Sequence, residues 1–226
     1  MSRAITPVQG DGVGYRNDVT DTRDRLIVAS AQLLGRQGYA GTGVKQIIDA
    51  ARAPFGSMYH FFPKGKEELG AESIRWSGAV YGQLIKVFYA PGIDPVAATR
   101  RFFEGAADTV RDTDYADACP IATVALEVAS TSEPLRQATA DVFEAWLSSL
   151  AANFIAAGLT PVPARRLATS LFSLLEGAFI LARATRDHEH VRIAGRTAAE
   201  AVKTALEKRA AQTGERRRPP SERARS

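Results

Sequence analysis

The sequence is poor in the residues that build cross-links and metal sites. It contains one cysteine, Cys119, and three histidines among 226 residues. A single cysteine excludes a disulfide within one chain and a zinc site made of several cysteines. Sparse cysteine is typical of proteins kept in a reducing compartment, so we expect a cytoplasmic protein.

Long apolar runs and a one-sided charge are also missing. No apolar run approaches the roughly 20 residues of a membrane span, and residues 1–19 lack the apolar segment of a secretory signal. Residues 207–226 hold seven Lys/Arg against three Asp/Glu, which accounts for the whole net charge of +4. The rest of the chain is neutral, so a DNA-binding role has to rest on local residues.

Strand signals are absent as well, because no stretch alternates cleanly between apolar and polar residues. The pattern is helical, rich in alanine, and divided by Gly and Pro. We therefore predict an all-α protein of about nine helices. The expected organisation is a disordered leader (1–20), a small N-terminal domain (21–66), a larger helical domain (67–210) and a disordered basic tail (211–226).

Residues 22–62 have the spacing of a three-helix unit with a helix-turn-helix. Helices are predicted at 22–37, from a cap at Thr42 to about Arg52, and at 55–62. In the second, apolar residues recur at helical spacing from Val44 to Ala51. In the third, Met58 and Phe62 can both face inward. The opposite side of that helix is then free to read a DNA groove.

A fourth helix is predicted from about Lys66 to Tyr89, after the stop signals Pro63 and Gly65. Its larger apolar side chains recur along the whole predicted length. These are Leu69, Trp76, Val80, Leu84 and Val87.

The segment "TGVKQIIDAARAPFGSMYHFFPKGKEELG" (42–70) resembles the N-terminal DNA-binding domain of TetR-type transcriptional regulators. The segments "FFPKGKEEL", "ACPIATVALEVAS" and "LLEGAFILARATRD" resemble the LmrA/YxaF-like subgroup of that family. The resemblance implies a small domain that binds DNA and a larger one that binds an effector and dimerises. The implied protein is a repressor that is not an enzyme and needs no metal or cofactor.

Two kinds of DNA contact are assigned within this motif, since phosphate contacts position a protein and base contacts specify sequence. The residues predicted to meet phosphates are Thr42, Tyr59, His60 and Lys66. Those predicted to meet base edges are Lys45, Phe55, Gly56 and Ser57. Pro54 and Phe55 depart from the polar residues usual in the family, so the operator sequence cannot be transferred from relatives.

The larger domain is expected to hold an apolar or aromatic effector and to pair with a second copy. Candidate pocket residues are Phe102, Phe103, Cys119, Phe143, Trp146 and Glu176. Glu176 is interpreted either as a ligand-recognising group or, preferably, as a residue at the edge of its helix in water. The resemblance implies a four-helix dimer interface from helices at 164–185 and 191–209. Its predicted residues are Leu167, Leu171, Leu174, Leu175, Ala178, Phe179 and Ala182. The implied two-fold dimer would place two recognition helices on a palindromic operator.

Two other functions remain open at this point. An all-helical enzyme could use the histidines, but His188 and His190 are two residues apart and do not share a helix face. No phosphate-binding glycine loop or nucleophile elbow is present. A redox-responsive regulator could use Cys119, which precedes Pro120 at a predicted helix start, although a free cysteine is more often a small buried apolar residue.

Overall fold

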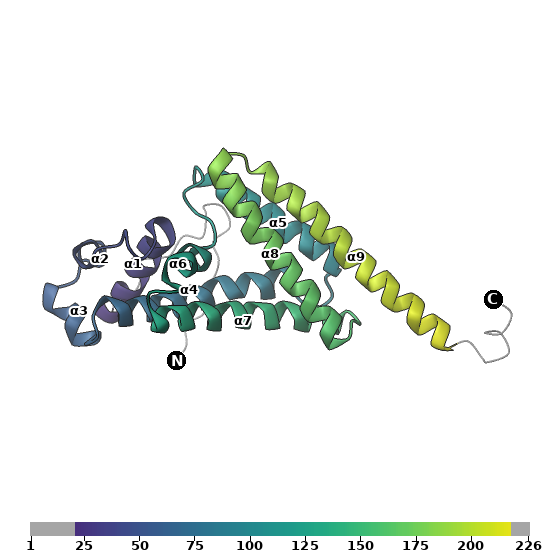
Figure 1. The fold of residues 1–226 in the computed structure, drawn as a ribbon, viewed down its shortest axis with the longest axis horizontal. Helices are drawn as coiled ribbons and strands as arrows, with labels where there is room; N and C mark the ends of the chain where they lie inside the picture. The colour runs from purple at the N-terminus through teal and green to yellow at the C-terminus, as the bar shows by residue number, and fades with distance from the viewer. Residues whose placement is uncertain (1–20, 218–226) are drawn as a thin grey trace.

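The computed structural model describes residues 21–217, and within that range the chain forms nine α-helices and no strand (Figure 1). This confirms the all-α prediction. The helices are α1 (Thr22–Gln37), α2 (Val44–Ala51), α3 (Phe55–Phe61), α4 (Lys66–Phe88), α5 (Pro95–Asp112), α6 (Pro120–Val128), α7 (Glu133–Ala156), α8 (Pro161–Thr185) and α9 (Glu189–Arg217). The predicted leader lies outside the described residues.

The first three helices form a small unit at one end of the molecule (Figure 1). Asp21 caps α1 by accepting the N–H of Arg23, and Gly38 ends it with φ 75°. The unit has its own apolar core, to which α4 contributes the buried Leu69 and the partly buried Trp76. The fully or nearly fully buried members are Leu26, Ile27, Ala29, Ile47, Ile48, Ala51, Met58, Phe62 and Leu69.

α4 belongs to both parts of the molecule. Leu69 lies in the small core, whereas Ile74 and Ile85 lie in the core of the larger part. α4 packs along α7, and the contact is close because it is made by small residues. A Cβ on Gly78 would lie 2.4 Å from Val142, and the Trp146 indole N–H donates to the Gly78 carbonyl at 2.8 Å.

The larger apolar residues of α4 do not outline its buried face. Leu69 is fully buried, Trp76, Val80 and Leu84 are partly buried, and Val87 is 54% exposed. The buried face consists mostly of small side chains that admit α7, which a search for large apolar residues cannot detect. Its residues are Leu69, Gly70, Ala71, Ser73, Ile74, Ser77, Gly78 and Ile85.

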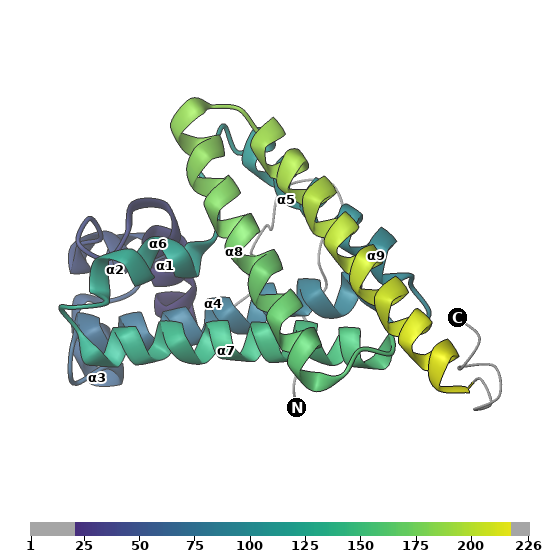
Figure 2. The same cartoon turned by 45° about the vertical axis from the view of Figure 1, so that its right-hand side comes forward.

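Helices α5–α9 complete the larger core together with α4. Figure 2 shows α8 crossing the layer of α4 and α7, with α9 running beside α5. Arg192 on α9 ties these two helices together through Glu104 and Asp108. α9 continues to Arg217, past residue 210, where the sequence analysis ended the larger domain; residues 218–226 lie outside the described part.

α8 is a long helix with a single charged residue, Glu176, between residues 167 and 182. By length and composition it could cross a membrane, with a mean hydropathy of 1.4 over 18 residues, of which 39% are buried in the protomer. The expectation that no segment approaches a span was therefore wrong. The helix packs against α7 and α9, so one of its faces belongs to a protein core. Its other face carries exposed apolar residues, including Ile180 and Leu181.

Candidate nucleic-acid interface

The turn between α2 and α3 is made by residues suited to end one helix and start the next. Arg52 adopts a left-handed conformation (φ 47°), and its N–H donates to the carbonyls of Asp49 and Ile48. Pro54 precedes α3 with φ −61°, the value that its ring imposes. The Ser57 N–H then donates to the Pro54 carbonyl at 3.0 Å. The turn is thus closed by backbone bonds, without a side-chain cap on α3.

The inner face of α3 is held by the two residues that the spacing predicted. Met58 and Phe62 are both 0% exposed and pack with Ile47 of α2 and Leu26 of α1. The Arg23 guanidinium also lies 5.3 Å from the centre of the Phe62 ring. This anchoring fixes which side of the short helix faces water.

The outer face of α3 presents the residues assigned to DNA, and we call Phe55, Gly56, Ser57, Tyr59 and His60 the reading face. Phe55 is 67% and Tyr59 53% exposed, His60 is exposed, and Ser57 is half-buried. A Cβ on Gly56 would meet nothing within 4 Å, so the backbone is open to close approach there. Large aromatic side chains left in water on a well-anchored helix favour a surface that meets a partner.

Lys45 lies on the exposed side of α2. The predicted phosphate contact of Thr42, in contrast, does not fit its position in the structure. Thr42 is 0% exposed, and its hydroxyl donates to the Gly38 carbonyl at 2.6 Å. Gly43 is the residue before α2, and its N–H donates to the Gln46 side chain at 2.8 Å. The cap prediction was therefore wrong, because Gln46 does the capping and the threonine hydroxyl is used inside the fold.

Lys66, the first residue of α4, is engaged within the protein. Its ammonium donates to the Tyr39 carbonyl at 2.6 Å and lies 4.0 Å from the centre of the Tyr39 ring. Burial lowers the pKa of Lys66, and the negative charge of Glu127 opposes that shift. The charge of Lys66 still lies at the start of α4. The preceding residue, Gly65, is close to the reading face, because a Cβ on it would lie 3.7 Å from the Tyr59 ring.

Two exposed cations near the reading face were missed. Arg52 ends α2 and Lys64 follows α3, and both side chains are exposed. The signal for them was available, since both lie beside the Pro and Gly that bound the third helix.

The candidate effector residues fall into two groups. Phe102 and Phe103 line a cavity of about 10 Å³, which is the size of a single water. Phe172 is another wall of this cavity and stacks on Trp146 with centroids 5.9 Å apart. Phe143 meets Trp146 edge-on at 5.9 Å. These aromatic residues are thus brought together, but around a nearly closed space.

Cys119 and Glu176 form the second group. Cys119 is buried at the start of α6, and its sulfur accepts the Ala122 N–H at 3.4 Å. Burial raises the pKa of the Cys119 thiol well above its ordinary value, and the nearby charge of Glu176 raises it further. A thiol with a raised pKa is a poor nucleophile at neutral pH, which disfavours the redox-sensing role.

The preferred interpretation of Glu176 as a residue in water was wrong. Its Oε1 atom is buried and has no hydrogen-bond partner among the described residues. Burial raises the pKa of its carboxyl to about 7. A buried, incompletely paired carboxyl costs stability, so its presence in the interior calls for an explanation beyond packing.

The predicted dimer stripe on α8 turns out to be its inner face. Leu167, Leu171, Leu175, Ala178 and Ala182 are all buried within the protomer. Leu174 and Phe179 are partly buried against the same core. These residues therefore stabilise the single chain, and the assignment to the interface was wrong for the buried ones. The exposed side of α8 is a different set of residues.

The histidines do not assemble a metal site in the described part of the chain, where no group of His, Cys, Asp and Glu is arranged to hold an ion. His188 instead shares a hydrogen bond of 3.4 Å with the Tyr115 hydroxyl.

Comparisons with known proteins agree with this geometry. Residues 26–72 match the family model for bacterial regulatory proteins of the tetR family, and residues 95–197 match that for the C-terminal domain of LmrA/YxaF-like transcriptional regulators. The chain is 34% identical over 167 residues to the uncharacterized HTH-type transcriptional regulator YxaF of Bacillus subtilis, covering 74% of this chain and 87% of that protein. It is 30% identical to the HTH-type transcriptional regulator LmrA of the same organism, covering 71% and 86%.

Solved structures show the same fold. A TetR transcriptional regulator from Legionella pneumophila superposes with a TM-score of 0.72 at 20% identity, covering 81% of this chain and 98% of that one. The reduced form of Escherichia coli NemR does so with a TM-score of 0.70 at 22% identity, covering 79% and 95%. The chain therefore belongs to the TetR family, in its LmrA/YxaF-like group, and is a DNA-binding transcriptional regulator.

Proposed function

We propose that this regulator is a repressor that leaves a palindromic operator when a small apolar or aromatic effector binds its larger domain. It acts in the cytoplasm as a homodimer, with double-stranded DNA and the effector as its partners. The observation that carries the proposal is the reading face, which is exposed on one side of α3 while Met58 and Phe62 fix the other side. A rigidly held helix with one open face is what groove recognition requires.

Each residue of the reading face has a proposed task. Gly56 lets the backbone approach the groove floor, and Phe55 makes apolar contact with a base such as the methyl group of thymine. Ser57 and Lys45 reach base edges, whereas Tyr59 and His60 bind phosphates. Lys66 adds its charge near the phosphates although its ammonium is already bound to Tyr39. Thr42 has no direct contact in this proposal, because it is buried.

The proposed effector site is the aromatic region around Phe102, Phe103 and Trp146. The cavity there has a volume of only about 10 Å³, so an effector enters only if the surrounding helices move. That requirement couples binding to conformation, because a ligand that favours the opened arrangement disfavours the closed one.

The proposed dimer interface is the outer face of α8 with α9. Ile180 is 59%, Leu181 52% and Ile193 49% exposed, so three large apolar side chains are left in water there. Gly177 precedes Ile180 and Leu181 in α8, and a Cβ on it would meet nothing within 4 Å. A glycine inside a helix costs about 1 kcal/mol relative to alanine. Close approach of a second helix explains that glycine, since the protomer itself does not use the space.

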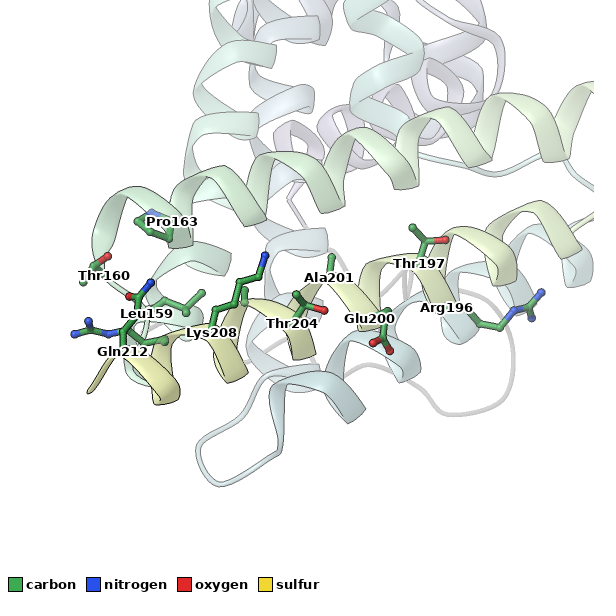
Figure 3. Close-up of a pocket in the computed structure, with 12 residues that line it drawn as sticks. Leu159, Thr160, Pro163, Arg196, Thr197, Glu200, Ala201, Thr204, Lys208 and Gln212 are labelled. Carbon is green, nitrogen blue, oxygen red and sulfur yellow. The ribbon is translucent and has the colours of Figure 1, made fainter. Parts of the chain in front are cut away.

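A groove of about 870 Å³ lies between the start of α8 and residues 196–212 of α9. Figure 3 shows its walls, with Thr160 and Pro163 on one side and a row from Arg196 to Gln212 along α9 on the other. We propose that helices of the second protomer fill it. Its lining combines apolar residues such as Leu159 and Ala205 with charged ones such as Lys208, a mixture found in protein–protein contacts.

Selection from a pool of random duplex DNA tests the proposal. The expected result is a palindrome, bound by the dimer and released by aromatic ligands added in competition. Failure to enrich any two-fold sequence contradicts the operator proposal. Undiminished DNA binding with a ligand bound to the larger domain contradicts the release mechanism.

A further inference from the structure

The last turn of α6 reaches the turn between α1 and α2. Glu127 lies 87 positions along the chain from Ala40, and its Oε2 accepts the Ala40 backbone N–H at 2.9 Å. Ala40 belongs to no helix, so the carboxylate supplies a partner that regular structure does not provide. A charged acceptor also makes a stronger bond than a neutral one. The larger part of the molecule thus contacts the backbone just before the helix-turn-helix.

Gly38 leaves the space that this carboxylate occupies. A Cβ on Gly38 would lie 1.7 Å from Oε1 of Glu127, a distance that no two non-bonded atoms can adopt. Gly38 also has a φ of +75°, which other residues rarely take. The glycine therefore serves two purposes: it ends α1 and it admits the Glu127 side chain against the turn.

The same turn is also held by α4. The Lys66 ammonium donates to the Tyr39 carbonyl at 2.6 Å, and the charge of Glu127 raises the pKa of Lys66 against the lowering effect of burial. The backbone of Tyr39 and Ala40 is therefore fixed between a cation at the start of α4 and an anion at the end of α6. This short segment leads directly into α2.

α6 itself is anchored in the larger core. Ile121, Val124 and Val128 are each 1% exposed and belong to that core. The first turn of α6 packs tightly on α1, because a Cβ on Gly35 would lie 2.9 Å from the Cβ of Pro120. Glu127 is thus a side chain of the larger domain that acts on the small one.

We propose that Glu127 is a positioning residue for operator binding, which sets the turn 38–41 and through it the placement of α2 and Lys66 relative to the reading face. The proposal rests on the DNA-binding function proposed above and names a point of its regulation. An effector that displaces α6 withdraws the carboxylate from Ala40 and leaves the turn unfixed.

The test compares Glu127→Ala with Glu127→Gln, which loses the charge but keeps an acceptor oxygen. Glu133→Ala is the control, because it removes an exposed carboxylate of the same domain with the same change in charge. The probe is the duplex enriched by selection. We expect Glu127→Ala to bind it about tenfold more weakly, as the loss of one charge-assisted hydrogen bond predicts. Glu127→Gln should stay within about twofold of the wild type, and Glu133→Ala should bind no more weakly than the wild type, since losing a negative charge favours DNA binding.

Hydrogen exchange of the Ala40 amide, measured without DNA, gives a second readout. Exchange should accelerate in Glu127→Ala only, while the salt dependence of DNA binding keeps its slope because no phosphate contact is lost. Unchanged protection of Ala40 in Glu127→Ala overturns the proposal, as does a Glu127→Gln variant as weak as Glu127→Ala. If no duplex is enriched, the operator function fails, and the exchange of Ala40 still decides the role of Glu127.

Discussion

At the scale of residues, Phe55 is the most unusual part of the reading face, because an apolar ring stands where the family commonly has a polar side chain. It is 67% exposed, so removing it changes little inside the protein. We expect Phe55→Ala to weaken binding to the selected duplex by about tenfold while unfolding free energy stays within about 0.5 kcal/mol.

Leu126→Ala is the matched control, since Leu126 is 77% exposed on α6 and lies away from α3. It should leave both DNA affinity and stability unchanged, measured by fluorescence anisotropy and urea unfolding. Equal affinity of Phe55→Ala and the wild type would show that the ring makes no contact with DNA.

Glu176 should make stability depend on pH. Its pKa is about 7 in the folded protein and about 4.3 when unfolded. Between these values the folded chain holds a proton that the unfolded chain has lost, so stability falls as pH rises. From pH 5 to pH 8 the wild type should lose roughly 3 kcal/mol more than Glu176→Gln, which cannot ionise.

Urea unfolding at fixed protein concentration measures this difference. Glu144→Gln serves as control, because the Arg165 hydrogen bonds lower the pKa of Glu144 and place its titration below this range. If the free energy of unfolding of the wild type and of Glu176→Gln changed with pH in parallel, the raised pKa of Glu176 would be contradicted.

Residue-level prediction succeeded where side-chain spacing decides the outcome. The i, i+4 pair Met58 and Phe62 predicted the inner face of α3 and therefore which residues are exposed opposite. It failed for Thr42, because the neighbouring Gly43 and Gln46 provide the cap and the threonine is drawn into the fold. It failed for Glu176, because a helical pattern does not reveal which neighbours cover a polar side chain.

At the scale of elements, α8 shows what periodicity leaves undecided. Its apolar residues lie on two faces, and the sequence does not say which face meets its own core and which meets another chain. Leu171 and Ala182 are buried in the protomer, whereas Ile180 and Leu181 are in water. α4 shows the complementary limit, since its tight packing on α7 depends on glycines and serines that carry no apolar signal.

The proposed role of the outer face of α8 can be tested with a charge. Leu181→Glu places two like charges at a two-fold interface and should raise the dimer dissociation constant by at least about a hundredfold. Leu126→Glu, at an exposed position on α6, should remain dimeric. Sedimentation equilibrium measures both, and a Leu181→Glu dimer as stable as the wild type would place the interface elsewhere.

At the scale of the whole molecule, two-fold symmetry fixes the distance between the reading faces. Recognition helices that meet successive major grooves stand roughly 34–36 Å apart, one turn of B-DNA. Five base pairs added at the centre of the selected palindrome place the half-sites on opposite sides of the duplex. Affinity should then fall by at least about a hundredfold, because one half-site loses its protomer.

The control duplex keeps its length and replaces the five central base pairs by another sequence. It should retain most of the affinity when both are measured at one salt concentration. An expanded site that binds as tightly as the original would show that the protomers act independently.

α4 fixes the rotation of the small N-terminal unit relative to the larger core. Leu69 belongs to one core and Ile74 to the other, and a single unbroken helix joins them. Each residue of a helix advances the direction by about 100°. Adding or deleting one residue between these two positions would therefore turn the reading face through more than a quarter of a circle. Point substitutions can change which bases this protein prefers, but the number of residues between Leu69 and Ile74 sets the direction in which the reading face points.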